Sequence, residues 1–420
     1  MSASRSTLPG SALPGVQENL SDELRVTGSN GMWICRQIAG TSYDCQQAGN
    51  RAGADRNGSI VTPGLFDVQV NGFAGVDFND ADIEPTDMDR ALSRLAASGV
   101  TRVLPTLITA CDDELAARLE ALDRAVSQSV LGPLMVPGYH LEGPFLSPLD
   151  GCAGCHPTTA MGPARPELIE RLAGLARRPI LMVTMAPEQE GVPQLMARLA
   201  GQGIACAIGH SNASREQIGD AIRMGARVST HLGNGLPHMI ARTDNPLFSQ
   251  LSRDELMAGF IADGIHIHPD YLKLFLRAKG LERAFLVTDA VAAAGPGMGE
   301  GLYRLGAMSI ERQADGTVRI PGSTYLAGSS ATMDQMVRNM EKWQGMDLPD
   351  ILKLTLDNPF RATFNRPFDL QRDHGGGFVH WQRDDAGELR VRRTRIGEHQ
   401  VLPDGSFLPH TPARSSSAAR

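Results

Sequence analysis

The amino-acid sequence predicts an α/β protein whose main domain is a closed (β/α)8 barrel of the TIM type, with a small β-domain formed from both chain ends. Two observations lead to this prediction. From about residue 61, eight short β-rich runs alternate with segments of helical period, which is typical of βα units and a parallel sheet. The polar residues best suited to chemistry follow the carboxyl ends of those runs, where the active sites of such barrels lie.

The eight candidate strands are short apolar runs, and amphipathic helices separate most of them. Strands are expected at 64–70, 101–107, 134–141, 180–185, 204–208, 227–232, 257–261 and 284–288. The expected helices include 86–98, 113–127, 166–176, 214–224 and, between the last two strands, 269–279. Ser214 with Gln217 three residues later has the capping-box pattern of a helix start.

Residues 21–60 and 370–410 are predicted to form the small β-domain together, and residues 61–369 the barrel. A β-like piece covers 32–38, and the segments 377–382 and 389–394 alternate like antiparallel strands. The chain returns to this domain after helices expected at 330–343 and 347–364. Residues 1–20 and 411–420 are predicted to be disordered tails.

Composition excludes several classes of protein. The net charge of −7 is spread over 420 residues without a block of like charge, so the basic footprint of a nucleic-acid-binding protein is missing. No window approaches 18 uninterrupted apolar residues, and the first 17 residues lack a cationic start followed by an apolar run. We therefore expect neither a membrane span nor a signal peptide. Six scattered cysteines in a long chain indicate reduced thiols and a cytoplasmic location.

Three strand-end residues are metal ligands by type. Glu142 lies in HLEGPF at 140–145, His210 in GHS at 209–211 and His231 in THL at 230–232. One carboxylate and two imidazoles at a common rim can hold a single divalent cation with coordination positions left open, as catalytic sites do. Such a cation would lower the pKa of a bound water and polarise a substrate carbonyl. The pattern therefore predicts a metal-dependent hydrolase.

Asp289, in VTDA at the end of the eighth strand, is the candidate general base. A carboxylate there could take a proton from water and return it to a departing amine. A strand-end aspartate is about as often only a turn former. Its place among the predicted metal ligands favours the catalytic interpretation.

The sequence predicts one metal ion rather than two. Many two-metal barrel hydrolases bridge their ions with a carboxylated lysine at the end of the fourth strand, but no lysine precedes residue 273. The first strand ends with Gln69 and Asn71 where a two-metal site would have two histidines. Neutral amides are poor ligands for a borderline metal ion. Glu142 would then be the only charged ligand.

The other histidines and the cysteine pair are weaker signals. His156 and His266 follow strand ends and are predicted to lean over a substrate, whereas His238 and His268 are predicted to be solvated or locally bonded loop residues. CAGC at 152–155 is a single CxxC without a second pair, so we interpret it as a glycine-containing loop rather than a redox or zinc site. The glycine-rich stretch at 295–301 lacks the lysine of a P-loop and is predicted to be a flexible loop.

Seven segments in this order resemble the N-acetylglucosamine-6-phosphate deacetylases of the amidohydrolase superfamily. They are PGLFDVQVNG at 63–72, HLEGPF at 140–145, GHSNAS at 209–214, THLGNG at 230–235, ADGIH at 262–266, VTDA at 287–290 and LAGS at 326–329. Together they span the chain from about residue 61 to residue 365.

The resemblance implies one divalent ion per subunit on Glu142, His210 and His231, with zinc expected first and iron(II) or another divalent ion as the alternative. Asp289 would act as general base and then acid, and His156 would help to polarise the acetyl carbonyl. His266 would contact the sugar and Leu326 the acetyl methyl group. The 6-phosphate would meet Asn234, the backbone of Gly235 and Arg242, and that arginine can come from a neighbouring subunit, which implies a homodimer. Gln69 and Asn71, also counted with the substrate-binding positions, match the single-metal members of the family.

The chain is therefore expected to hydrolyse N-acetylglucosamine 6-phosphate to glucosamine 6-phosphate and acetate. Gly233, Gly235 and Asp244 depart from the family pattern close to the expected phosphate site. Two other interpretations stay open: the same chemistry on another N-acyl amino sugar, and a non-catalytic barrel that binds an amino sugar. A non-catalytic barrel would be expected to lack a ligand or the base, and all four residues are present.

Overall fold

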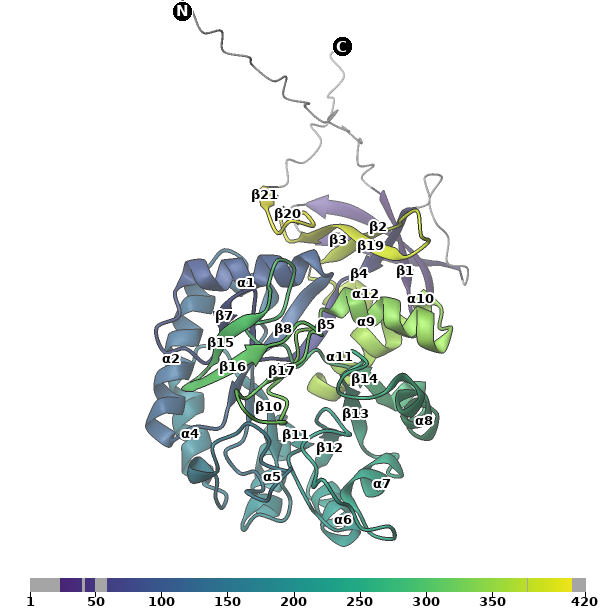
Figure 1. Cartoon of the computed structure of the whole chain (residues 1–420). Helices are drawn as coiled ribbons and strands as arrows, with labels where there is room; N and C mark the ends of the chain where they lie inside the picture. The colour runs from purple at the N-terminus through teal and green to yellow at the C-terminus, as the bar shows by residue number, and fades with distance from the viewer. Residues whose placement is uncertain (1–22, 40–41, 50–58, 376, 410–420) are drawn as a thin grey trace, which may run out of the picture.

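Eight parallel strands form the centre of the molecule (Figure 1). The structure is a computed structural model that describes residues 23–39, 42–49, 59–375 and 377–409. Neighbouring strands of the barrel follow the chain order, as expected for consecutive βα units. They are β5 Leu65–Val70, β8 Val100–Ile108, β9 Tyr139–Glu142, β10 Ile180–Met185, β11 Ala205–Ile208, β12 Ala226–Ser229, β13 Met257–Phe260 and β14 Ala284–Leu286.

The first and last strands meet and close the barrel. Val70 and Ala290 form a parallel bridge, and the backbone N–H of Asn71 donates to the carbonyl of Ala290 at 2.7 Å. Below this bridge, the buried Asp67 carboxylate accepts hydrogen bonds from the hydroxyl of Thr288 at 2.6 Å and from its backbone N–H at 3.2 Å. The predicted (β/α)8 barrel is confirmed.

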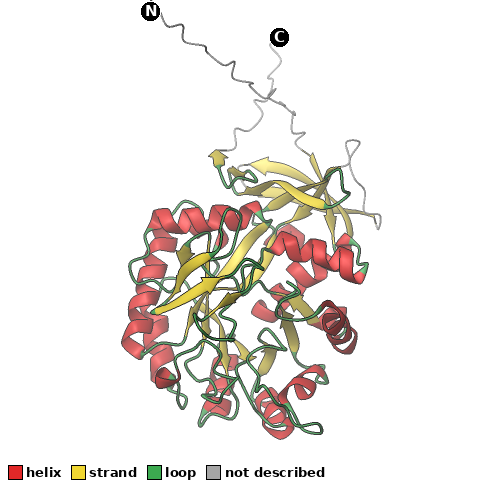
Figure 2. Ribbon diagram, in the orientation of Figure 1, coloured by secondary structure: helices red, strands yellow, loops and turns green. Residues whose placement is uncertain are grey.

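Most of the helices surround the barrel and bury an apolar stripe against its strands, whereas the short helix Leu370–Asp373 packs on the small sheet (Figure 2). The predicted capping box is present, since the Ser214 hydroxyl accepts from the Gln217 backbone and the Gln217 side chain accepts from the Ser214 backbone. In the described part of the chain, no helix has the length and apolar character needed to span a bilayer. The helices are α1 Pro85–Ala97, α2 Asp112–Gln128, α3 Gly132–Met135, α4 Pro166–Leu175, α5 Val192–Gly201, α6 Arg215–Arg223, α7 Pro246–Leu251, α8 Pro269–Lys279, α9 Met333–Asn339, α10 Leu348–Leu352, α11 Asn358–Phe364 and α12 Leu370–Asp373, with single turns η1 Thr158–Ala160 and η2 Leu281–Arg283 and π-helical segments η3 Met340–Gln344 and η4 Lys353–Asp357.

Both chain ends contribute to the second sheet, which lies beside the barrel (Figure 1). Its order is β21-β20-β19-β18-β4-β1-β2-β3, so strands from the two ends meet where β18 pairs with β4. The small β-domain is therefore confirmed, while its exact limits at residues 60 and 370 stay a prediction. The predicted disordered tails, 1–20 and 411–420, lie outside the described residues. The strands are β1 Glu23–Gly28, β2 Gly31–Ala39, β3 Ser42–Gly49, β4 Ser59–Pro63, β18 Phe378–Arg383, β19 Leu389–Ile396, β20 His399–Val401 and β21 Phe407–Pro409.

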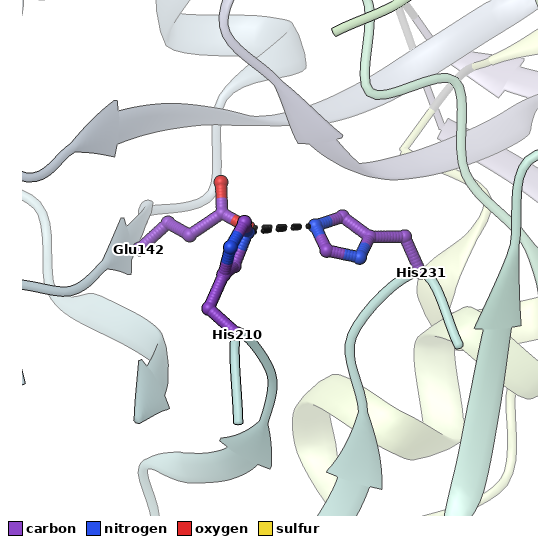
Figure 3. Close-up of side chains that lie close together, drawn as sticks. All are labelled: Glu142, His210 and His231. Atoms are coloured by element: carbon purple, nitrogen blue, oxygen red, sulfur yellow. Dashed lines mark hydrogen bonds and ion pairs between the residues drawn. The ribbon is translucent and has the colours of Figure 1, made fainter. Parts of the chain in front are cut away.

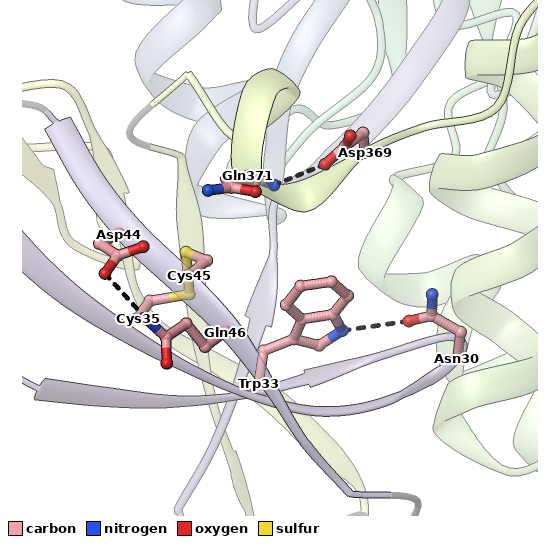
Figure 4. Close-up of a disulfide and its surroundings, with 8 residues drawn as sticks. All are labelled: Asn30, Trp33, Cys35, Asp44, Cys45, Gln46, Asp369 and Gln371. Atoms are coloured by element: carbon pink, nitrogen blue, oxygen red, sulfur yellow. Dashed lines mark hydrogen bonds between the residues drawn. A yellow bond between two sulfur atoms is a disulfide. The ribbon is translucent and has the colours of Figure 1, made fainter.

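The expectation that all cysteines are reduced is wrong for one pair. Cys35 and Cys45 form a disulfide between β2 and β3 (Figure 4). The antiparallel register places these two residues directly opposite each other, with their Cα atoms 4.0 Å apart. The register of the two strands creates this proximity, and the sequence spacing alone did not reveal it.

The predicted strand at 134–141 is also wrong over its first half. Residues Gly132–Met135 form the short helix α3, with a proline in its first turn, and the strand begins only at Tyr139. Short apolar runs are ambiguous between helix and strand, because both bury the same side chains.

The helices α5 and α7 were not predicted from the sequence, and neither was a three-stranded sheet that follows β14. That sheet consists of β15 Gly301–Leu305, β16 Met308–Arg312 and β17 Val318–Arg319, and it packs a small apolar cluster, including Leu305 and Ile310, against residues at the end of the barrel. A further hairpin, β6 Gly72–Phe73 with β7 Val76–Asp77, follows the first barrel strand.

Trp381 joins the small β-domain to the barrel. Its side chain is fully buried, and its indole N–H donates to the Thr62 hydroxyl at 2.9 Å. The same apolar cluster contains Trp381, neighbouring residues of β18 and β19, and the barrel core. Nearby, the Thr394 hydroxyl donates to the carbonyl of Ala96 at the end of α1 at 2.6 Å. The two parts of the chain therefore share one hydrophobic core.

We predict that Trp381→Ala lowers the free energy of unfolding by about 3–5 kcal/mol, because it leaves a large cavity in this shared core. Trp381→Phe should cost about 1–3 kcal/mol, since it mainly removes the indole hydrogen bond. Chemical unfolding followed by circular dichroism measures both. The control is Leu302→Ala, whose side chain is 70% exposed and should change stability by less than about 0.5 kcal/mol. Equal denaturant concentrations at the unfolding midpoint for Trp381→Ala and for the control would contradict a shared hydrophobic core.

Candidate active site

A pocket of about 450 Å³ lies at the carboxyl ends of the barrel strands. Glu142 is the last residue of β9, His210 and His231 each follow the end of a strand by two residues, and Asp289 follows β14 by three. All four line the pocket and are less than 10% exposed. Parallel strands bring their carboxyl ends to one rim, and so residues up to 147 positions apart meet there.

Glu142, His210 and His231 point toward a common position (Figure 3). Glu142 Oε1 lies 3.2 Å from His210 Nε2 and 3.0 Å from His231 Nε2, and the two nitrogens are 3.2 Å apart. The structure thus brings together the three residues that the sequence predicted as metal ligands.

The hydrogen bond on the far side of His210 indicates what these atoms can bind. His210 Nδ1 lies 2.7 Å from the carbonyl oxygen of Cys152, which can only accept a hydrogen bond. Nδ1 of neutral His210 therefore carries the hydrogen, and its Nε2 presents a lone pair toward the Glu142 carboxylate. Two electron-rich atoms at this distance repel each other unless a positive charge lies between them. The donor set, one carboxylate oxygen and two imidazole nitrogens, fits a divalent cation of the zinc or iron(II) type.

Backbone strain is concentrated at the same residues. Among the described residues, five other than glycine have a positive φ, and three of them are His210 at 51°, His231 at 26° and Asp289 at 49°. Such conformations cost of order 1–3 kcal/mol each and persist only where the surroundings enforce them. The barrel therefore holds the backbone of His210, His231 and Asp289 in conformations that an unconstrained strand end would not adopt. These conformations set the directions of two candidate metal ligands and of the candidate base.

The two amides of the first strand contact the two carboxylates. The Gln69 side-chain N–H donates to Glu142 Oε1 at 2.9 Å, and the Asn71 side-chain N–H donates to Asp289 Oδ1 at 2.7 Å. Asn71 lines the pocket, whereas Gln69 is buried beneath it. At the two positions where a two-metal site would have histidines, this chain has amides, and each amide orients a carboxylate.

Asp289 lies in an environment that favours its protonated form. Burial, and then the negative charge of Glu142, raise the pKa of the Asp289 carboxyl to about 6. A carboxyl group with a pKa near the working pH can both accept and donate a proton.

The loop after β9 supports the site more closely than its sequence indicated. The imidazole of His156 lies 4.4 Å from that of His210 between ring centroids, and its Nδ1 lies 3.0 Å from the Thr109 hydroxyl. Burial is the main cause that lowers the pKa of His156 to about 3, so its imidazole is neutral. The Cys155 thiol lines the pocket, and burial raises its pKa to about 12. The CAGC loop therefore acts mainly through its backbone, at the Cys152 carbonyl.

Most of the predicted substrate-binding residues line the same pocket. They are Asn71, Asn234, Gly235, His266 and Leu326. His266 is held by Asp263, whose carboxylate lies 2.7 Å from His266 Nδ1. Gly235 has a φ of +61°, and a Cβ atom there would lie 3.0 Å from His210 Nδ1, so this position needs glycine to leave His210 in place.

Arg242 is the exception, because it is exposed and is not among the described residues that line the pocket. Conversely, His238 and Tyr325 line the pocket, and neither was predicted to do so. His238 is exposed and lies 3.3 Å from the Tyr325 hydroxyl, as predicted for a solvated or locally bonded loop residue. The one available signal was their position, three residues after Gly235 and directly before Leu326.

Comparison with known proteins places the chain among sugar-phosphate deacetylases. No protein-family model matches it. It is 32% identical to the N-acetylglucosamine-6-phosphate deacetylase of Bacillus subtilis (strain 168), over 71% of this chain and 74% of that protein. It is 30% identical to the N-acetylgalactosamine-6-phosphate deacetylase of Escherichia coli O157:H7, over 73% of this chain and 79% of that protein. A mutant N-acetyl-D-glucosamine-6-phosphate deacetylase from Mycobacterium smegmatis, solved in complex with N-acetyl-D-glucosamine-6-phosphate, matches with a TM-score of 0.79 and 30% identity, covering 91% of this chain and 98% of that chain. The chain belongs to the N-acetylglucosamine-6-phosphate deacetylase family.

Proposed function

We propose that this protein hydrolyses the acetamide of N-acetylglucosamine 6-phosphate to glucosamine 6-phosphate and acetate. The observation that carries the proposal is the convergence of Glu142 Oε1, His210 Nε2 and His231 Nε2 within 3.2 Å, in the pocket that also holds Asp289. Family membership supports the sugar phosphate as substrate, since the relative from Mycobacterium smegmatis was solved in complex with it.

Glu142, His210 and His231 would hold one divalent ion per subunit, zinc or iron(II). When bound, such an ion supplies Lewis acidity to the acetyl carbonyl and lowers the pKa of a bound water. The contribution of the chain is to hold its ligands: Gln69 orients the Glu142 carboxylate, and the carbonyl of Cys152 orients His210.

Asp289 is the residue that moves the proton. As a carboxylate it takes a proton from the water that attacks the acetyl carbon. It then returns that proton to the sugar nitrogen as the C–N bond breaks, which yields a neutral amine and acetic acid. The acid loses its proton to the solvent and is released as acetate. The hydrogen bond from Asn71 keeps the carboxylate in place. His156 faces the carbonyl oxygen as a neutral imidazole and donates a hydrogen bond as negative charge develops there.

The remaining residues of the pocket would position the sugar. His266, fixed by Asp263, contacts the ring hydroxyls, and Leu326 covers the acetyl methyl group. Asn234 and the backbone of Gly235 approach the 6-phosphate.

We place the protein in the cytoplasm and in a homodimer. A sugar phosphate is charged and does not cross a lipid bilayer, so an enzyme for it works where the phosphate is made. The homodimer is supported by Arg242, which lies outside the pocket of its own protomer, and by exposed apolar residues near it, with Met239 at 89% and Phe248 at 58% exposure.

Glu142→Gln should weaken metal binding by roughly 100-fold or more, because it removes the only charged ligand candidate. Elemental analysis of the purified protein should give about one metal ion per wild-type chain and almost none per variant. A chelator should lower the melting temperature of the wild type but not that of the variant. Glu190→Gln, at an exposed position, is the matched control and should keep its metal ion. Full metal content in Glu142→Gln would contradict the site.

Asp289→Asn should lower kcat by about a hundred-fold to ten-thousand-fold with unchanged metal content, because an amide cannot accept the proton. In the wild type the base must be ionised, so a raised pKa means that kcat/KM falls as the pH drops through it. We expect this fall at about pH 6 or below, since a bound cation opposes the rise of the Asp289 pKa. The control is Asp82→Asn, at an exposed position. Wild-type turnover by Asp289→Asn would exclude this base.

Arg242 should act in the pocket of the partner subunit. Arg242→Ala and Asp289→Asn should each be nearly inactive alone on the phosphorylated sugar. Co-expressed, they should recover about a quarter of wild-type activity, because half of the dimers are mixed and each mixed dimer has one intact site. Acetate release and light scattering measure activity and mass. A monomer, or no recovery in mixed dimers, would contradict the shared site.

A further inference from the structure

Three loops meet at the outer end of the pocket, and three polar side chains connect them. The Tyr325 hydroxyl donates a hydrogen bond to the Asp150 carboxylate and lies 3.3 Å from Nε2 of His238. The rings of His238 and Tyr325 are 5.5 Å apart between centroids. Asp150 belongs to the loop after β9, His238 to the loop after β12, and Tyr325 to the segment after β17. We call these three residues the rim cluster.

The loops under the rim cluster pack closely. A Cβ atom at Gly151, which has a φ of +79°, would lie 2.6 Å from the carbonyl oxygen of Leu236 and 2.9 Å from the backbone nitrogen of His238. His238 is therefore carried by a segment that is held in place, although its side chain is exposed.

Burial distinguishes the inner from the outer end of the pocket. Glu142, His210, His231 and Asp289 are less than 10% exposed, whereas His238 is exposed. In the proposed function, on which this inference rests, the acetamide must lie at the inner end. The acetamido group on C2 and the C6 arm, which starts from C5, extend from opposite sides of a pyranose ring. A phosphate on C6 must then lie at the outer end, beside the rim cluster.

Within one protomer, charge narrows the choice of side chains that can bind that phosphate together with Arg242 of the partner subunit. No arginine or lysine occurs among the described residues that line the pocket. His156, His210 and His231 lie together at the inner end, and His266 is paired with Asp263. Among the pocket-lining histidines of the described chain, this leaves His238 as the imidazole at the outer end. An imidazolium presents two N–H donors, and charge-assisted hydrogen bonds to phosphate are among the stronger ones.

Tyr325 accounts for the orientation of His238. Because the phenol donates to Asp150, its oxygen is left to accept from His238 Nε2–H. In the imidazolium form, the Nδ1–H group of His238 is then left as its second donor. We propose that His238 recognises the phosphate monoester on C6 of the substrate, with Tyr325 as the residue that positions it.

The test compares N-acetylglucosamine 6-phosphate with N-acetylglucosamine as substrates of the metal-loaded enzyme. His238→Ala and His238→Gln should raise KM for the phosphorylated sugar by about ten-fold or more and leave kcat/KM for the unphosphorylated sugar within about two-fold. His238→Arg, which supplies a cationic donor, should stay within about three-fold of wild type on the phosphorylated sugar. Tyr325→Phe should raise the same KM by a few-fold, because it keeps the ring but removes the acceptor for His238.

Leu302→Ala is the control, since its side chain is 70% exposed and is not among the described residues that line the pocket. The kinetic constants of this control should match those of the wild type on both substrates. Its melting temperature and metal content provide the reference for the other variants. If His238→Ala and His238→Gln both keep the wild-type ratio of KM for the phosphorylated sugar to KM for the unphosphorylated sugar, the assignment of His238 is wrong. The proposed deacetylase function would then still stand.

A binding measurement separates this assignment from the proposed function. Calorimetry with glucosamine 6-phosphate and with glucosamine probes the phosphate contact without any reaction. His238→Gln should weaken binding of the phosphorylated amine by about ten-fold, with no change for glucosamine. If the wild type turns over neither acetylated sugar, the proposed function fails, and the calorimetry still decides the role of His238. Equal affinity of wild type and His238→Gln for glucosamine 6-phosphate would overturn that role.

Discussion

One buried carboxylate oxygen connects most of the active site. Glu142 Oε1 lies within 3.2 Å of side chains from three other strand ends: Gln69 near the end of β5, His210 after β11 and His231 after β12. A carboxylate that is almost fully buried needs compensating charge or several hydrogen bonds. Here one amide donor and two imidazoles surround it, and a cation would supply the missing positive charge. The position of this atom therefore constrains four strands at once.

The closure of the barrel makes that arrangement possible. Asp289 and Asn71 come from the last and first strands, and they meet only because β14 and β5 are joined at Val70 and Ala290. The same closure imposes the left-handed backbone at Asp289. Conformational strain at such positions is tolerated because a large apolar core surrounds them, and that core extends from the barrel into the small β-domain through Trp381.

The pocket also separates two kinds of chemistry. Its inner end is buried and contains the proposed metal ligands and Asp289, where a low dielectric strengthens electrostatic interactions. Its outer end is more exposed and is lined by His238 and Tyr325. The loop at 152–155 lies between the two, where the carbonyl of Cys152 holds His210. A substrate with an amide at one side and an anionic group at the other matches this division.

The sequence alone determined the order of the eight βα units and the types of residue at the strand ends. Both follow from local patterns, since the period of apolar residues and the polar residue after each run are visible within a few positions. Glu142, His210 and His231 could be predicted as a group for that reason. The helix α3, the sheet of β15–β17 and the Cys35–Cys45 pair could not, because short or cross-strand features depend on contacts that the local pattern does not encode. Only the tertiary structure decided that Arg242 lies outside its own pocket while His238 lines it, because loop side chains are placed by packing against other loops, far away in the sequence.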